Sequence, residues 1–350
     1  MFKIKTHYHI NFTALLLLIC LLTGCNSQSP NIKSATRDNL LGTTITISIY
    51  DNIPDSLFDT IITQCFDTIN DIEARMSVNR ADSEISRLNE NHEGAFPVSD
   101  DIYELIKNAI QFSYHTTGAF DISVGSVMEL WKQDGDFIFL PSPIDIIERL
   151  TYVGYKAISF PADNKISIPT GMKLDLGAFA KGHALEVVRG ILIKNGIKHA
   201  ILDFGGDIFT LGKKPDGSNY RVAIKTPIIG DNSLVCIVEV SDLSVMTSGG
   251  YERYFEQDNA YYHHILDPAT GYPANNKLLS VTVISPDPIG ADALSTAGFV
   301  LGLEKGMNLI NELEGYEAIF ITEEKEIYVT DGLHGAVTVL NEGFRKISYN

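Results

Sequence analysis

The sequence predicts an α+β fold, in which helices come first and a largely antiparallel sheet region with helices packed against it follows. Helical apolar spacing dominates the chain up to about residue 194, and short alternating runs separated by turn residues dominate after about residue 200. No repeat, low-complexity segment or linker-like stretch divides the chain, so we expect no clean split into separate domains.

The first half begins with one strand and continues as helices. Residues 43–49, TTITISI, alternate as a strand does. A long helix follows Pro54, and its apolar positions keep a helical stripe from Leu57 to Met76. Ser99 is expected to cap a further helix that runs to about residue 114. Other helices are predicted at residues 82–89, 124–131, 144–150 and 180–194.

Strand patterns dominate the second half. Turn residues such as Gly205-Gly206 and Asp216-Gly217 separate them. The predicted strands are residues 200–203, 208–211, 220–225, 234–240, 243–247, 261–266 and 279–285. Two helices, at residues 290–301 and 305–313, and further strands complete the chain.

The N-terminus has the pattern of a targeting segment. Two lysines precede an apolar run at residues 12–22, which is too short for a membrane span and fits a secretory signal. The run ends in Leu-Thr-Gly-Cys, which resembles a bacterial lipobox, so we expect residues 1–24 to be removed and Cys25 to be lipidated. We assign residues 25–38 to a polar tether and residues 39–350 to the folded domain.

The charge balance excludes one class of partner. The 350 residues have a formal net charge of −17, and no block of Lys and Arg is present. A nucleic-acid partner would require a basic patch, so we expect none. A protein this acidic that handles an anionic substrate must use local positive charge or a bound cation.

Cys65 and Cys236 remain after the N-terminal cysteines are assigned to targeting. Cys65 falls on the apolar face of a predicted helix and Cys236 in a predicted strand. Their positions have no metal-ligand spacing, so we expect buried packing thiols.

A first candidate site is residues 290–296, GADALST. In a helix, Asp292 and Thr296 share one face, and a carboxylate and a hydroxyl there can bind a hard cation, with the carbonyl of Ser295 as a further ligand. Spacing alone favours a plainer interpretation, in which Asp292 lies in the first helical turn and Thr296 hydrogen-bonds to a backbone carbonyl.

Two turns form a second group of candidates. Residues 174–182, LDLGAFAKG, place an Asp, a Gly turn and Lys181 at the start of a helix, which can present backbone N–H groups and a cation to phosphate. The spacing is not that of a Walker loop, and an ordinary strand–helix junction explains it equally well. Residues 118–121, GAFD, are a turn with an aromatic and an acid and indicate little alone.

The stretch YYHHILDPATG, residues 261–271, contains two adjacent histidines. In a strand, His264 faces one side with Tyr262 and His263 faces the other, so only one can face a given cleft. His264 and Asp267 can meet at the turn that Pro268 and Gly271 favour. The residues alone leave strand decoration and catalysis both open.

Taken together, these segments resemble the ApbE family of bacterial flavin transferases, from about Leu40 to near the C-terminus. The resemblance rests on ordered motifs along the chain. They are LGTT, MSVNRADSEISRLN, TTGAFDISVGSVMELW, LDLGAFAKGHALEVV, LDFGGDIFTLG, TSGGYERYF, HILDPATGYP and SVTVISPDPIGADALSTAGFVLG. We therefore expect an ApbE-like fold.

The resemblance implies an activity and a set of site residues. Members transfer the FMN half of FAD to a threonine of an acceptor protein, release AMP and require Mg²⁺. Asp292 and Thr296 match the magnesium ligands, and Ala178 and Ser295 match positions that contribute to the same ion, through backbone oxygen. The positions that match FAD contacts are Leu41, Asn79, Ala119, Phe120, Asp121, Asp175, Lys181 and Ile265. His264 matches the motif histidine; because a hydroxyl nucleophile needs a base, we assign His264 that role, with Asp267 orienting it or acting as the base instead.

One position departs from the family pattern. Members commonly have an aromatic residue where this chain has Asn79, and an aromatic there can stack on a cofactor ring. We therefore keep two alternatives, an Mg²⁺-dependent FAD pyrophosphatase that forms FMN and AMP, and a non-catalytic FAD-binding lipoprotein. The expected acceptor is a membrane redox-complex subunit or another extracytoplasmic protein, with the enzyme lipid-anchored to a bacterial membrane on its periplasmic side.

Overall fold

A computed structural model describes residues 32–91, 94–133 and 136–348, without the side chains of Gln133, Asp136 and Phe137. The predicted signal peptide and the predicted lipidation site, Cys25, lie outside these residues. The structure confirms the α+β class. Within its described part, no helix is long and apolar enough to cross a membrane.

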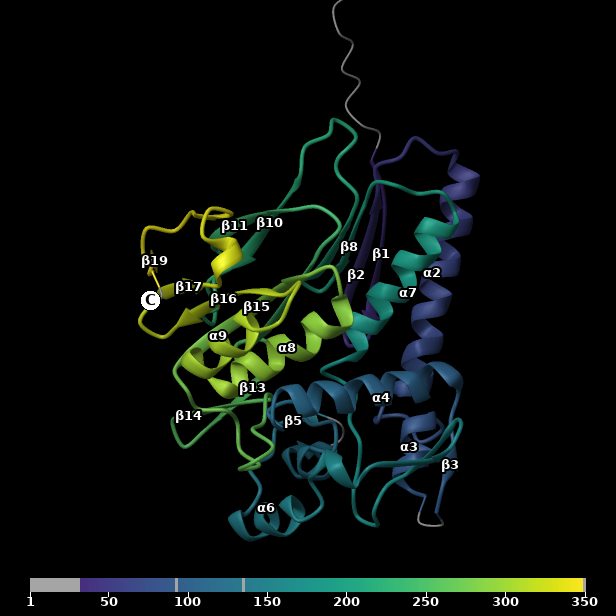
Figure 1. Cartoon of the computed structure of the whole chain (residues 1–350), viewed down its shortest axis with the longest axis vertical. Helices are drawn as coiled ribbons and strands as arrows, with labels where there is room; N and C mark the ends of the chain where they lie inside the picture. Colours follow the sequence, from purple (N-terminus) through teal and green to yellow (C-terminus); the bar gives the residue numbers. More distant parts are fainter. Residues whose placement is uncertain (1–31, 92–93, 134–135, 349–350) are drawn as a thin grey trace, which may run out of the picture.

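A nine-stranded sheet forms the centre of the molecule (Figure 1). Its strands, in spatial order, are β1 (Lys33–Leu40), β2 (Thr43–Ile49), β8 (Ala200–Phe204), β9 (Asp207–Leu211), β12 (Ser244–Gly249), β15 (Leu278–Ser285), β16 (Glu317–Thr322), β17 (Glu326–Val329) and β19 (Arg345–Lys346). All neighbours are antiparallel except β17 and β19, which are parallel.

The first strand corrects the predicted domain boundary. Residues 33–38, which we assigned to the polar tether, belong to β1 and pair with β2. Most of β1 is exposed or half-buried at the edge of the sheet, so its sequence lacks the apolar alternation that identified β2. The folded part of the chain therefore begins by Lys33.

Helices cover one face of the sheet. Figure 1 shows α2 (Asp55–Met76), α7 (Ala180–Lys194) and α8 (Pro288–Leu301) next to one another on this face, with α9 (Leu303–Asn311) beside α8. The apolar stripe of α2 is buried from Ile61 to Met76, as predicted, but Leu57 is exposed near its first turn. Cys65 of the same helix is a buried free thiol, and so is Cys236, as the sequence predicted.

A smaller sheet packs on the opposite face of the main sheet. It consists of β10 (Tyr220–Lys225), β11 (Leu234–Val240) and β18 (Val337–Val339). Strand β12 shows how the two cores are divided, because Val245 points into the core beneath this smaller sheet and Met246 into the core beneath the helices. The central strands of the main sheet are thus buried on both faces.

Residues between α2 and α7 form the lower part of the molecule in Figure 1. Its elements are α3 (Glu84–Asn89), β3 (Phe96–Pro97), α4 (Asp100–His115), α5 (Gly125–Met128), a 3-10 turn (Glu129–Trp131), β4 (Lys132–Gln133), β5 (Asp136–Phe137), α6 (Pro143–Leu150), a 3-10 turn (Tyr155–Ala157), β6 (Ser159–Ala162) and β7 (Lys165–Ser167). The hairpin of β13 (Tyr254–Gln257) and β14 (Ala260–His263) joins this part, and a 3-10 turn (Asp331–Leu333) lies near the C-terminus.

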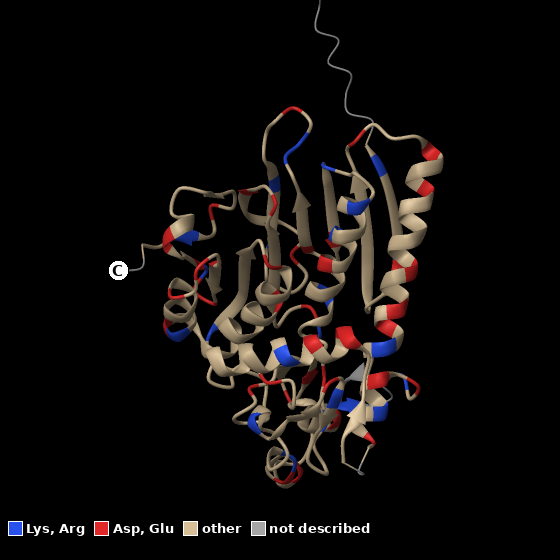
Figure 2. Ribbon diagram, turned by 45° about the vertical axis from the view of Figure 1, so that its right-hand side comes forward, with Lys and Arg blue, Asp and Glu red and all other residues tan. Residues whose placement is uncertain are grey.

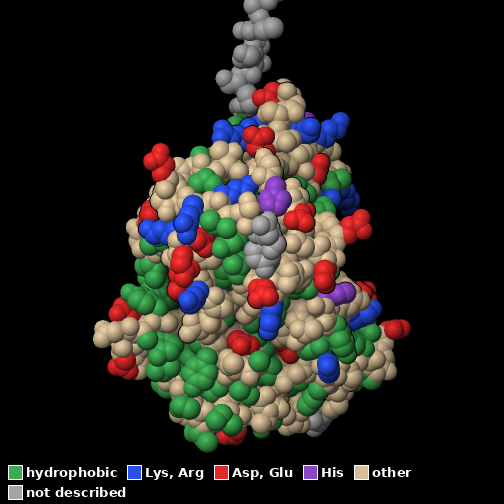
Figure 3. Space-filling model, turned by 60° about the vertical axis from the view of Figure 1, so that its left-hand side comes forward, with side chains coloured by type: hydrophobic (Ala, Val, Ile, Leu, Met, Phe, Trp, Pro, Cys, Tyr) green, Lys and Arg blue, Asp and Glu red, His purple; other side chains and the backbone are tan. Residues whose placement is uncertain are grey.

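The surface agrees with the acidic composition. Figure 2 shows Lys and Arg interspersed with Asp and Glu along the ribbon, with no continuous basic block in that view. Hydrophobic side chains gather toward the lower end in Figure 3, the end at which α6 lies in Figure 1. Ile144 and Ile147 of α6 are 70% and 63% exposed.

Candidate active site

Helix α8 places Asp292 at the centre of the candidate site. Asp287 caps this helix by accepting the Ile289 amide at 3.1 Å, and Asp292 follows one turn later. The Oδ2 atom of Asp292 accepts the backbone N–H of Gly182 at 2.8 Å, one of the unpaired N–H groups in the first turn of α7. A Cβ at Gly182 would lie 2.4 Å from the carbonyl oxygen of Pro288, so glycine allows the two helices to approach this closely.

The Asp292 carboxyl is nearly inaccessible to solvent, at 4% exposure. Burial raises its pKa, the Lys181 ammonium opposes that shift, and the Asp207 carboxylate adds to it. No hydrogen-bond partner for its Oδ1 atom is found within the described residues. A buried carboxylate with one free oxygen is therefore available to a cation.

Three hydroxyl groups cluster in the next turn of α8 and on the strand beside it. Ser248 of β12 has its Oγ 2.8 Å from Oγ of Ser295 and 3.1 Å from Oγ1 of Thr296. The Ser295 hydroxyl donates to the carbonyl oxygen of Asp292 at 2.9 Å. The predicted helical register therefore holds for Asp292, Ser295 and Thr296. Strand β12 adds Ser248, which was not predicted from the sequence.

These oxygens fit a magnesium ion. No group of three or more His, Cys, Asp or Glu side chains suited to a metal is found in the part of the chain that the structure describes. Mg²⁺ needs no such cage, since it is commonly held by one or two carboxylates, other oxygen donors, waters and substrate phosphates. One buried carboxylate and two hydroxyl side chains within two turns of α8 match that requirement.

Lys181 is the positively charged residue next to Gly182, whose amide bonds to Asp292. In the first turn of α7, its ammonium forms an ion pair with the buried carboxylate of Asp207. Burial opposes the charge on Lys181, but Asp207 and Asp292 more than offset it and raise the pKa of the lysine. The Lys181 charge also acts on His264, so these groups belong to one electrostatic neighbourhood.

The two histidines have different roles in hydrogen bonding. Strand β14 ends at His263, one residue short of His264 and three short of the predicted strand end. Nε2 of His263 lies 3.0 Å from the carbonyl oxygen of Ala274, and its Nδ1 accepts the Ile265 amide at 3.3 Å, so both ring nitrogens have partners. Nδ1 of His264 lies 3.2 Å from the carbonyl oxygen of Arg253.

This contact settles the tautomer of His264. Because a carbonyl oxygen only accepts, Nδ1 of His264 must hold the proton, and the lone pair is on Nε2. No partner for Nε2 is found among the described residues. Burial lowers the pKa of His264 to about 4, so the ring is neutral at neutral pH.

The expected pairing of His264 with Asp267 is absent from the described structure. Oδ1 of Asp267 instead accepts the Ala269 amide at 2.8 Å, within the turn that Asp267 itself begins. Its backbone carbonyl accepts the Gly271 amide at 2.8 Å. The backbone of Arg253, not the carboxylate of Asp267, therefore orients His264.

The turn after His264 is held against the lower part of the molecule. The indole Nε1 of Trp131 donates to the carbonyl oxygen of Gly271 at 3.0 Å. Gly271 has a φ of 72°, and a Cβ there would lie 2.7 Å from a methyl carbon of Ile146 on α6. This position requires glycine for both reasons, and the contact joins α6 to the segment that contains His264.

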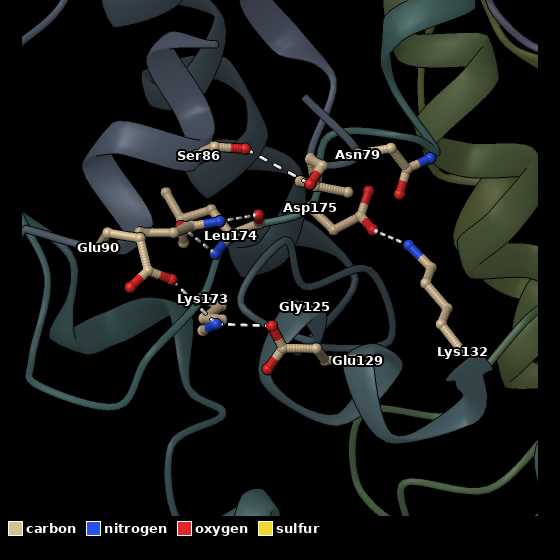
Figure 4. Close-up of a pocket in the computed structure, with 11 residues that line it drawn as sticks. Asn79, Ser86, Glu90, Gly125, Glu129, Lys132, Lys173, Leu174 and Asp175 are labelled. Atoms are coloured by element: carbon tan, nitrogen blue, oxygen red, sulfur yellow. Dashed lines mark hydrogen bonds and ion pairs between the residues drawn. The ribbon is translucent and has the colours of Figure 1, made fainter. Parts of the chain in front are cut away.

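A cavity of about 430 Å³ lies between α3, α5 and the loop before α7 (Figure 4). Asn79 and Asp175, two of the expected FAD contacts, line it together. Lys132 reaches Asp175 across the cavity at 3.3 Å, and Lys173 bonds to Glu129 at its lower edge. The cavity therefore has polar and charged walls of both signs.

The Asn79 amide is open to a ligand. Its backbone N–H bonds to Ser77, and its side chain has no hydrogen-bond partner among the described residues. Figure 4 shows it next to Asp175, whose Oδ1 caps the Gly177 amide at 2.8 Å. A ligand in the cavity can therefore meet a free amide at residue 79, where the family commonly has an aromatic.

Residues 119–121 form a buried turn beside this cavity. Phe120 is buried and packs against Phe179 with ring centroids 5.6 Å apart. The Asp121 carboxylate accepts from the amides of Ser123 and Tyr155 at 2.8 and 3.0 Å. Burial raises its pKa, which these hydrogen bonds oppose. These side chains shape the turn, so its contacts to a nucleotide would come from backbone atoms.

The remaining expected contacts lie in loops around the site. Leu41 is in the β1–β2 turn with a φ of 50°, and its neighbour Gly42 accepts from Arg253 at 3.3 Å. Ala178 lies in the turn before α7. Ile265 is buried directly after His264.

Asp207 and Ser248 are the site residues that the sequence analysis missed. Both fall in segments already noted as family motifs, LDFGGDIFTLG and TSGGYERYF. An acid directly after a Gly-Gly turn, and a serine before a second Gly-Gly pair, were the available signals.

Comparison with known proteins gives a consistent result. The model of the ApbE family matches residues 41–320. A protein of Treponema pallidum named FAD:protein FMN transferase is 33% identical over 94% of this chain and 96% of its own length. One of Klebsiella pneumoniae with the same name is 33% identical over 88% of this chain and 95% of its own length. The crystal structure of an ApbE protein from Thermotoga maritima superposes with a TM-score of 0.80 at 32% identity and covers 86% of this chain and 98% of that one.

Proposed function

The chain belongs to the ApbE family and transfers FMN from FAD to an acceptor protein, and we propose that it does so with Mg²⁺ and with His264 as the base. The acceptor group in this proposal is a threonine hydroxyl. The observation that supports it best is the hydrogen bond from the Gly182 amide to the buried Asp292 carboxylate at 2.8 Å, which brings the first turn of α7, with Lys181, against the candidate metal ligand. In this proposal the candidate metal ligands and the candidate base act on the same substrate.

The proposed reaction is a substitution at the FMN phosphorus. The threonine oxygen forms a bond to this phosphorus, the bridging P–O bond of the pyrophosphate breaks, and AMP leaves with that electron pair. Nε2 of His264 accepts the threonine proton. It is free to do so because the backbone carbonyl of Arg253 keeps the ring proton of His264 on Nδ1. The proton then passes to solvent or to the leaving phosphate.

Charge neutralisation is the main requirement of such a reaction. Asp292, Thr296 and the oxygens of Ser295 and Ala178 would hold the magnesium ion, which supplies positive charge at the pyrophosphate oxygens. Lys181 adds a second positive group from the first turn of α7. Both are needed because the chain as a whole is acidic.

Asn79 supports hydrolysis as a second activity. Its free amide lines the cavity in which an aromatic residue would otherwise cover a ligand ring. A lost stacking contact is worth about 1 kcal/mol, which weakens retention of FAD. Water can then replace the threonine as nucleophile, with FMN and AMP as products.

A non-catalytic FAD-binding role is less well supported. A binding protein would not need an imidazole whose Nδ1 is fixed by a backbone carbonyl and whose Nε2 is left without a partner. It would also not need a buried carboxylate against the first turn of the helix that carries Lys181.

We further propose that Cys25 is lipidated and anchors the enzyme to a bacterial membrane with the folded part on the periplasmic side. The support is the lipobox-like sequence before Cys25. The acceptor would then be a subunit of a membrane redox complex or another extracytoplasmic protein with a flavin-attachment threonine.

Incubation of the protein with FAD, Mg²⁺ and a candidate acceptor, followed by intact-mass spectrometry, tests the proposal. A mass gain of one FMN on the acceptor supports transfer to protein. Free FMN and AMP without acceptor modification would assign the chain to the hydrolytic activity. Unchanged FAD would reject both.

A further inference from the structure

Asp207 has no assigned role, yet it makes the closest contact to Lys181. Its side chain is 3% exposed, and its Oδ2 forms the ion pair with the lysine ammonium. The other carboxylate oxygen, Oδ1, accepts the backbone N–H of Thr247 at 2.8 Å. Both oxygens are therefore used, one toward α7 and one toward β12.

The sheet explains why the Thr247 amide is available. Strands β9 and β12 pair only at Ser244 with Phe209 and at Val245 with Ile208. Beyond this point the ladder ends, and the Asp207 carboxylate takes the place of a backbone acceptor for the next free amide of β12. The position of Asp207 is thus fixed by the backbone of a strand in the main sheet.

Strand β12 also fixes the other side of the site. Ser248, directly after Thr247, bonds to the hydroxyls of Ser295 and Thr296. One strand therefore sets the distance between the lysine, held through Asp207, and the candidate metal ligands on α8. A lysine side chain has four rotatable bonds, so without such a partner its ammonium would sample many positions.

We propose that Asp207 is a positioning residue for the transfer reaction, which holds the Lys181 ammonium beside the pyrophosphate of FAD. This inference rests on the proposed function, because it requires a phosphate substrate at Lys181. Asp207 itself touches neither substrate nor metal in this role. It fixes the lysine before the reaction, so that charge can be neutralised in the transition state without rearrangement.

A double-mutant cycle tests this role. The variants are Asp207→Asn, Lys181→Met and the double variant, measured with FAD, Mg²⁺ and acceptor for kcat and KM. Each single change is expected to lower kcat at least about tenfold, with a smaller change in KM for FAD, because the lysine acts on charge that develops in the transition state. The double variant is expected within about threefold of Lys181→Met, because Asp207 has nothing left to position.

Asp203→Asn is the matched control. Asp203 lies just before the same Gly-Gly turn and accepts the Gly206 amide at 2.8 Å, but it makes no contact with Lys181 in the described structure. We expect its activity to stay within about twofold of wild type. If Asp207→Asn does not fold, as judged by circular dichroism and thermal melting, Asp207→Ser, which also lacks the carboxylate, replaces it in the cycle.

Two results would overturn the inference. One is a double variant whose loss is the product of the two single losses, which would mean that Asp207 acts independently of Lys181. The other is a folded Asp207 variant with wild-type kcat. Failure of the proposed function gives a different result, since the wild-type protein would then form neither flavinylated acceptor nor free FMN.

Discussion

Nδ1 of His264 faces the carbonyl oxygen of Arg253 at 3.2 Å, and this relationship separates His264 from its neighbour His263. We expect His264→Gln to lower FMN transfer by about 10²–10⁴-fold, the usual contribution of a general base. His263→Gln should retain most activity and lower the thermal midpoint, because both nitrogens of His263 bond within the protein. Initial rates of FMN transfer to the acceptor distinguish the two variants. A His264→Gln enzyme with near wild-type rate would exclude this residue as the base.

Asp267 offers a contrasting prediction. Its carboxylate caps its own turn at Ala269, so Asp267→Ala should keep the transfer rate that His264 sets and lose stability instead. The expected loss is about 1 kcal/mol in urea unfolding, with transfer reduced less than about tenfold. A loss as large as that of His264→Gln would reassign the base to Asp267.

The candidate metal ligands predict a dependence on Mg²⁺. Chelation should abolish transfer and Mg²⁺ should restore it, while Asp292→Asn and Thr296→Val should raise the Mg²⁺ concentration needed for half-maximal rate. We expect at least about a tenfold rise for Asp292→Asn, since it removes the one carboxylate that α8 supplies. Thr282→Val is the control. Thr282 is a buried threonine of β15, and its hydroxyl bonds to that of Thr247 rather than to Asp292. An unchanged Mg²⁺ requirement in Asp292→Asn would place the ion elsewhere.

Asn79 predicts the balance between transfer and hydrolysis. Asn79→Tyr should retain FAD more tightly by about 1 kcal/mol, roughly fivefold in Kd, and release less free FMN. Asn79→Ala is the matched control, since it removes the amide without adding a ring. Equilibrium dialysis with FAD and chromatography of the products measure both effects. Equal affinity in the Tyr and Ala variants would argue against stacking at this position.

His183 and His263 predict how stability depends on pH. Burial lowers the pKa of both side chains, and for His183 the Asp101 carboxylate opposes and the Arg75 guanidinium adds to that shift. Because the folded-state pKa lies below the unfolded value of about 6.5, the unfolded chain binds more protons, and stability falls as the pH drops through that value. Urea unfolding at about pH 8 and about pH 5.5 should show the loss, and His183→Gln should reduce it. A free energy of unfolding that rises toward pH 5.5 would contradict the conclusion that these two histidines are buried in their neutral form.

The parts of the site that the sequence predicted are those set by local geometry. Asp292 and Thr296 share a face because a helix places residues four apart together, and that register holds in α8. Asp207 and Ser248 could not be placed in the same way, because they meet Lys181 and Thr296 only through the order of strands in the sheet. Pairing between distant strands leaves no signal in either strand alone.

Two errors have equally specific causes. The edge strand β1 was assigned to the tether because an exposed strand needs no apolar alternation. The pairing of His264 with Asp267 was expected from their spacing, but an aspartate at the start of a turn bonds first to the backbone amide two residues on. Fold class depends on the many apolar positions of both halves, which explains why it was predictable.

The bond between the Trp131 indole and the Gly271 carbonyl spans 140 residues of sequence. Closing a loop of this length costs conformational entropy, which must be met before the contact stabilises anything. The segment that contains His264 therefore gains its support only after the lower part of the molecule has closed on it. The chemistry proposed at His264 therefore depends on a contact made by residues that are distant from it in the sequence.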